Sequence, residues 1–176
     1  SEDVIEDLNI LLDEMNAIKN LFNSKMVDEM TIEFITLIKN IELISFDQEL
    51  LSNKLNQFPS YSSEIKNIAF SQYLIKDKII RFIEQLIQVS NKTLHIPPGI
   101  NSSIGSAQLS IQKSIALMEQ KNIKKELRDE QSKAIKSINE TAYILLSSLN
   151  KMQSSMSASG MESYLEELSK MAEGQQ

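Results

Sequence analysis

The fold of this chain is indicated most directly by residues 27–58, which read VDEMTIEFITLIKNIELISFDQELLSNKLNQF. Apolar side chains recur there at alternating spacings of four and three residues, with one polar member, Gln48. This spacing draws a single stripe along a helix, and such a stripe has to be buried against other helices. The stripe consists of Val27, Met30, Phe34, Leu37, Ile41, Ile44, Gln48, Leu51, Leu55 and Phe58.

The same spacing recurs along the rest of the chain and predicts further helices. Together with the first, they cover about 3–22, 27–57, 61–89, 101–120, 126–152 and 161–172. Only Asn23 and Ser24 separate the first two, without Gly or Pro, so one long kinked helix is an alternative to the two helices that we expect. Pro59 and the Pro97-Pro98 pair interrupt later stripes.

Long amphipathic helices with short connections are typical of antiparallel neighbours. We therefore expect an all-α fold, an elongated antiparallel bundle of five to six helices in coiled-coil-like hairpins. The bundle is expected to occupy residues 1–152, followed by a Ser-rich linker over 153–160 and a short C-terminal docking helix over 161–172.

The composition excludes several classes of function. The 176 residues carry a formal net charge of −6, which argues against nucleic acid as a ligand. With no Cys and one His, the chain lacks the residues for a thiol nucleophile, a disulfide framework or a Cys/His zinc site. We expect no catalytic residue, no cofactor and no metal, and therefore no enzyme.

The two ends and the hydropathy of the chain bear on its context. The sequence begins with Ser1 rather than Met and stops at Gln176 soon after a predicted helix, so we expect a piece of a longer protein. No run of residues approaches the roughly 18 apolar residues of a membrane span, and no signal peptide is evident. We expect this segment to be soluble, and its compartment is unknown from the residues alone.

Two glutamines stand where the stripes are otherwise apolar. Burying an amide without a partner costs about 1–3 kcal/mol, so Gln48 and Gln72 need hydrogen-bond partners. In an antiparallel hairpin turning at Pro59-Ser60, opposing residue numbers add up to about 120, which pairs Gln48 with Gln72. We predict a polar pair that fixes the helix register.

Three further groups of residues are candidates for contacts or chemistry. The single His95 and adjacent acidic pairs such as Asp28-Glu29 match no catalytic or calcium-binding motif, so we interpret them as loop and surface residues. A basic patch is predicted at Lys121, Lys124, Lys125 and Arg128, where a solvated helix end is the alternative. A docking face is predicted at Met161, Tyr164, Leu165, Leu168 and Met171.

Short segments of the chain support one resemblance. Ile44–Glu49, Ile96–Ile100 and Ser137–Ala142 resemble the C-terminal helical region of a family of large membrane-anchored bacterial envelope proteins of unknown function. The likeness covers about residues 28–176. Those proteins share N-terminal membrane-spanning helices and a middle extracytoplasmic portion. The resemblance implies an extracytoplasmic place in the bacterial cell envelope and supplies no catalytic residues.

These observations favour a non-enzymatic helical interaction or scaffold module, a soluble part of a bacterial cell-envelope protein. We expect a protein partner or self-association, with a homodimer as one form. The alternatives are a cytosolic helical adaptor or regulatory subunit, and a fragment of an enzyme completed by a missing domain.

Overall fold

The computed structural model shows an all-α bundle, as the stripes predict. Its four described helices are α1 (Glu2–Gln57), α2 (Glu64–Thr93), α3 (Ile100–Glu119) and α4 (Lys125–Ser155). The description covers residues 2–58, 63–93, 97–120 and 125–155, with no side-chain detail for residues 2–12, 18–24, 26, 93 and 153–155.

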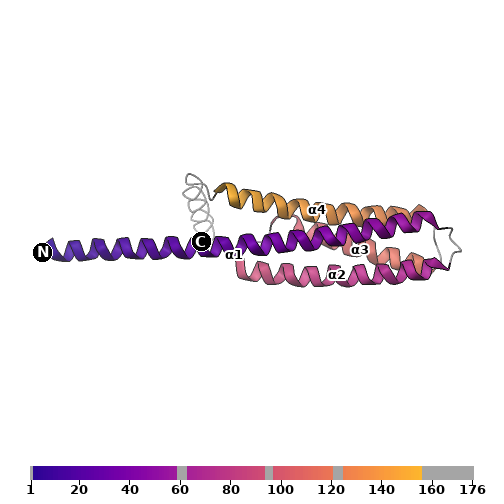
Figure 1. The fold of residues 1–176 in the computed structure, drawn as a ribbon, viewed down its shortest axis with the longest axis horizontal. Coiled ribbons are helices and arrows are strands. Elements are labelled where there is room, and N and C mark those ends of the chain that lie inside the picture. The colour runs from indigo at the N-terminus through magenta and orange to yellow at the C-terminus, as the bar shows by residue number, and fades with distance from the viewer. Residues whose placement is uncertain (1, 59–62, 94–96, 121–124, 156–176) are drawn as a thin grey trace.

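The helices form a closed ring in cross-section. α1 packs against α2 and α4, and α3 packs against the same two helices. Helices that follow one another in the chain run in opposite directions, and α4 closes the ring by lying beside α1 (Figure 1). The ring has the up-down-up-down topology that short connections favour.

The first helix is continuous, so the expectation of two helices over 3–22 and 27–57 is wrong. α1 runs without a break through Asn23 and Ser24. Both residues keep the backbone N–H that Pro lacks, and each lowers helix propensity only slightly. This merger also reduces the predicted number of helices by one.

α1 is much longer than its neighbours, with 56 residues against 30, 20 and 31. A helix of that length extends about 84 Å at 1.5 Å per residue. Its N-terminal part therefore projects beyond the end of the bundle, while its C-terminal part lies along α2 and α4 (Figure 1).

The C-terminal boundary differs from the expected one. α4 continues to Ser155, so the first three residues of the predicted 153–160 linker are helical. Serine is a moderate helix former, and no Gly or Pro occurs between Met152 and Ser155 to end the helix earlier. The rest of the linker and the predicted helix 161–172 lie outside the described residues.

The core is built from the predicted stripes, and aromatic and branched side chains fill it. Phe34, Ile41, Ile79, Phe82 and Ile111 are at most 1% exposed. In α4 the stripe predicted at Ile135, Ile138, Ala142, Leu145, Leu149 and Met152 is buried at Ile138, Leu145 and Leu149. Ala134 and Thr141 are buried in place of Ile135 and Ala142, which are only partly buried. The Thr141 hydroxyl lies 2.9 Å from that of Ser103 on α3, so this polar residue is satisfied inside.

The connection between α2 and α3 depends on one glycine. Gly99 has a φ of 85°, in the left-handed region that side chains disfavour, directly before the first residue of α3. Its carbonyl accepts a hydrogen bond from the Ser103 backbone N–H at 3.0 Å. The turn after Pro97-Pro98 thereby starts α3 in the direction that returns it along α2.

We expect the core and surface positions to respond differently to truncation. Ile41→Ala removes a fully buried side chain and should lower the free energy of unfolding by about 2–5 kcal/mol. Leu109→Ala on α3, where the leucine is 53% exposed, should change it by less than about 0.5 kcal/mol. Urea denaturation followed by circular dichroism measures both, and equal losses would contradict this assignment of the core.

Candidate functional site

A cluster of three glutamines lies in the centre of the bundle. Gln48 of α1, Gln72 of α2 and Gln131 of α4 are each 0% exposed. Gln72 Nε2 donates to Gln48 Oε1 at 2.7 Å, and Gln48 Nε2 donates back to Gln72 Oε1 at 3.3 Å. The structure thus brings together the two residues that the hairpin arithmetic pairs.

The third amide completes the cluster. Gln131 Nε2 donates to Gln72 Oε1 at 2.6 Å, and Gln48 Nε2 donates to Gln131 Oε1. Every side-chain oxygen in the cluster accepts a hydrogen bond, and every amide nitrogen donates one. The cluster holds α1, α2 and α4 at one relative height, because each amide bonds to an amide on another helix.

The sequence analysis missed Gln131, although a signal for it exists. The stripe predicted for 126–152 begins at Ile135, and its spacing extended backward by four residues reaches Gln131. The stripe does not show which helix Gln131 faces. Only the packing of α4 against α1 places this amide beside Gln48.

Glu130, a buried charged residue, directly precedes Gln131 of the cluster on α4. Its residue is 6% exposed, and its Oε1 accepts from Lys133 Nζ at 2.8 Å. Burial raises the pKa of Glu130, but the contacts with Lys133 and Ser110 and the charges of Lys133 and Lys113 lower it more. The net pKa lies below its ordinary value, so the carboxylate is held in its charged form.

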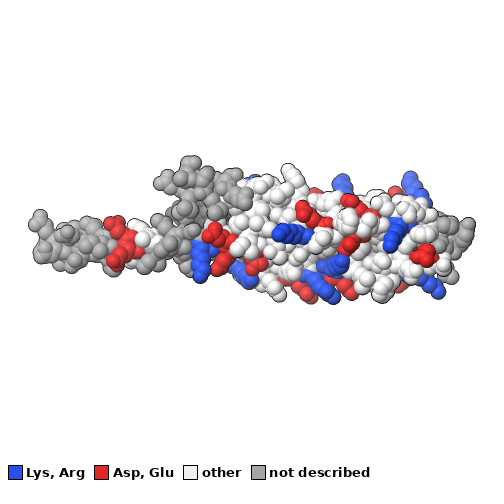
Figure 2. Space-filling view, viewed as in Figure 1, with Lys and Arg blue, Asp and Glu red and all other residues white. Residues whose placement is uncertain are grey.

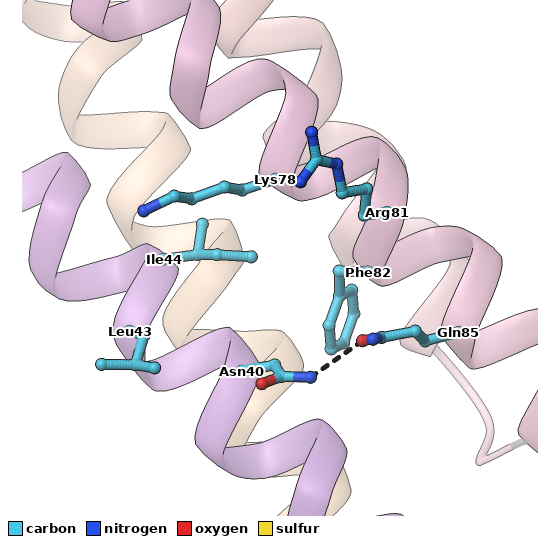
Figure 3. Close-up of a pocket in the computed structure, with 7 residues that line it drawn as sticks. All are labelled: Asn40, Leu43, Ile44, Lys78, Arg81, Phe82 and Gln85. Atoms are coloured by element: carbon cyan, nitrogen blue, oxygen red, sulfur yellow. Dashed lines mark hydrogen bonds between the residues drawn. The ribbon is translucent and has the colours of Figure 1, made fainter.

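A groove lies between α1 and α2 (Figure 3). Its volume is about 250 Å³, just below the range typical of ligand pockets, about 300–1,000 Å³. Ile44 and Phe82 form its buried floor, and Asn40 Nδ2 donates to Gln85 Oε1 at 2.8 Å across one end. Lys78, on the rim, pairs with Asp47 at 2.5 Å, so we interpret this space as a shallow helix–helix groove.

The outer surface of α1 carries large apolar side chains that nothing in the described part of the chain covers. They are Met15 (60% exposed), Ile32 (64%), Leu43 (62%), Phe46 (58%) and Leu50 (47%). We call these five residues the outer stripe. Single exposed apolar residues are ordinary, whereas a row of them along one helix is a candidate contact surface.

The other predicted site residues fall into two groups. Lys125 and Arg128 are exposed in the first turns of α4, whereas Lys121 and Lys124 lie outside the described residues. On the face drawn in Figure 2, basic and acidic side chains alternate along the bundle, so no large patch of one sign is visible there. The docking face at 161–171 and His95 also lie outside the described residues.

Two further kinds of site are absent from the described residues. No helix there is long and apolar enough to cross a membrane. Within the same ranges, no three His, Cys, Asp or Glu side chains gather as a metal ion would need.

Comparison with known proteins adds no relative to this description. Neither a protein-family model, nor a curated protein, nor a solved structure matches the chain.

The hydrogen-bond pattern of the glutamine cluster predicts an order of stabilities. Gln72→Met removes three of the hydrogen bonds and should lower the free energy of unfolding by about 1–3 kcal/mol. Gln131→Met leaves the Gln48–Gln72 pair intact and should cost less. The triple Met variant, in which no amide remains unpaired, should be more stable than Gln72→Met in urea denaturation. Additive effects of the single changes would show that the three amides do not interact.

The lowered pKa of Glu130 predicts a pH dependence. A carboxylate whose folded pKa is depressed contributes stability above its unfolded pKa, about 4.3 for glutamate, and loses that stability as the pH falls below this value and through the lower folded pKa. Glu130→Gln should therefore be less stable than the parent at pH 7 and lose less stability on acidification. Glu126→Gln, an exposed position on the same helix, should follow the parent profile. Thermal melts at several pH values test this, and parallel profiles for all three proteins would refute it.

Proposed function

We propose that this chain is a non-enzymatic helical interaction and scaffold module that works by presenting one face of a long helix to a protein partner. The observation that carries the proposal is the outer stripe of α1, whose five large apolar residues are between 47% and 64% exposed. Apolar area of this extent gains free energy when it is removed from water, at about 25 cal/mol per Å². A helical partner fits such a stripe, because two helices pack through side chains that recur at spacings of four and three residues.

The bundle supports this role by acting as a rigid base for α1. The ring closes through contacts of α1 with both α2 and α4. The glutamine cluster resists sliding of α1 against those helices, because a shift in height would leave buried amides unpaired. The projecting part of α1 thus leaves the bundle in a fixed direction, as a scaffold requires.

The setting that we propose comes from the resemblance given above. Membership of a bacterial envelope protein would place this bundle outside the cytoplasm. The basic patch at Lys125 and Arg128 and the docking face at 161–171 enter the proposal as secondary contact surfaces, for an acidic partner and an apolar one respectively.

Photo-crosslinking in the cells that produce the intact protein tests the proposed role. A crosslinking residue at Leu43 or Phe46 should form covalent adducts with a polypeptide, because these positions lie on the outer stripe. The same residue at Leu109 of α3, which is 53% exposed, is the matched control and should form none. Equal adduct formation at all three positions, or none at any, would refute the assignment of this face as the contact surface.

A further inference from the structure

The outer stripe of α1 follows the same spacing as the apolar residues in the projecting part of the helix. Alternating steps of four and three from Val4 reach Leu8, Leu11, Met15, Ile18 and Phe22, and then every later member of the outer stripe. The full series is 4, 8, 11, 15, 18, 22, 25, 29, 32, 36, 39, 43, 46 and 50. Because α1 is one continuous helix, these positions form a single seam from end to end.

This seam is distinct from the one that packs in the bundle. The core residues Phe34, Leu37, Ile41 and Ile44 follow the same steps but are offset from the outer series by two residues. On a heptad wheel that offset puts the two series on opposite sides of the helix. α1 therefore has one seam for its own bundle and a second that the described chain does not cover.

The second seam has a symmetry of its own. Its upstream part, 4–22, and its part along the bundle, 32–50, have equal lengths and lie at equal distances from position 27. The upstream members are all apolar, whereas the part along the bundle has the apolar Ile32, Leu43, Phe46 and Leu50 with the polar Thr36 and Lys39 among them. Between the two parts come Lys25 and Glu29, two exposed residues of opposite charge, also symmetric about position 27. If an antiparallel copy of the same helix is centred at position 27, the numbers of two opposing residues add up to 54.

We propose that α1 forms an antiparallel two-fold dimer with α1 of a second copy of this chain, through the outer seam over residues 4–50. The inference rests on the proposed function, since it names the occupant of the same surface. The projecting part of each copy then lies along the bundle of the other, and the overlap extends for about 70 Å. A two-fold contact of this kind uses the same surface twice and is closed.

Charge decides the direction of the second helix. In the antiparallel arrangement Lys25 of each copy faces Glu29 of the other, which makes two attractive pairs. In a parallel dimer in register, Lys25, Glu29 and Lys39 would each face the same residue of the other copy, and like charges opposite one another are destabilising. Lys39 instead comes level with Met15 of the second copy, beside that copy's acidic Glu14.

The projecting segment supplies a second reason for a partner. Isolated helices are marginal in water, and most helical stability in proteins comes from packing of an amphipathic face. Upstream of the bundle α1 has no neighbouring helix within the described chain (Figure 1). The outer seam of a second copy is long enough to pack along the whole projecting segment.

Disulfide trapping distinguishes the possible arrangements, because the chain contains no cysteine. Met15→Cys and Lys39→Cys are prepared separately, mixed and oxidised under mild conditions. The antiparallel dimer predicts a mixed 15–39 disulfide and little linkage of either variant to itself. Self-linkage at both positions would show a parallel dimer and overturn the proposal, as would the absence of any linkage.

Charge exchange provides a test that does not depend on cysteine geometry. Analytical ultracentrifugation of the 176-residue chain should show a dimer. Lys25→Glu should weaken it about tenfold by opposing acidic residues, and Lys25→Glu with Glu29→Lys should restore the parent affinity. Leu109→Glu is the matched control and should leave the molar mass measured by ultracentrifugation at that of the dimer.

These outcomes separate the dimer from the broader role. A parent chain that remains monomeric, or a double exchange that fails to restore affinity, overturns the antiparallel dimer. Photo-adducts of Leu43 and Phe46 with a different protein would still support the interaction module. Absence of adducts at those positions, together with a monomeric chain, would remove both proposals.

Discussion

Three glutamine amides in the dry centre of the bundle determine how the rest of the molecule is arranged. Apolar side chains alone would tolerate a shift of helix register, because similar apolar residues can take one another's places in the core. Amides do not, since each loses its partner when a helix moves by one turn and then costs about 1–3 kcal/mol. Gln48, Gln72 and Gln131 therefore fix α1, α2 and α4 at one height, and α3 follows through its packing against α2 and α4.

Because the helix register is fixed, the unequal helix lengths leave part of α1 outside the bundle. α1 is nearly twice as long as α2 or α4, so one end of it has no neighbour in the ring. The core seam serves the bundle, and the opposite seam carries Met15, Ile32, Leu43, Phe46 and Leu50 into solvent. A single helix thereby packs in the core on one side and carries exposed apolar residues on the other. The proposed scaffold role and the antiparallel dimer both depend on this division.

Several buried polar residues of the described bundle pair with one another across helices. The glutamine hydrogen bonds are satisfied within the cluster, the Thr141 and Ser103 hydroxyls meet each other, and the Glu130 carboxylate is held charged by Lys133. The exposed groups differ in kind, because they are apolar residues and alternating charges (Figure 2). Recognition by helix packing suits such a surface better than binding of a small ligand does.

The sequence by itself determined the helices, their inward stripes and the pairing of Gln48 with Gln72, because periodicity and hairpin arithmetic are properties of neighbouring residues along the chain. It misplaced the start of the first bundle helix, since Asn23 and Ser24 lower helix propensity only slightly and do not end a helix. Only the tertiary structure showed that α4 closes on α1 and brings Gln131 to the cluster. It also showed that the outer series of α1 has no neighbour among the described helices. Such contacts depend on which helices pack side by side, which no local pattern records.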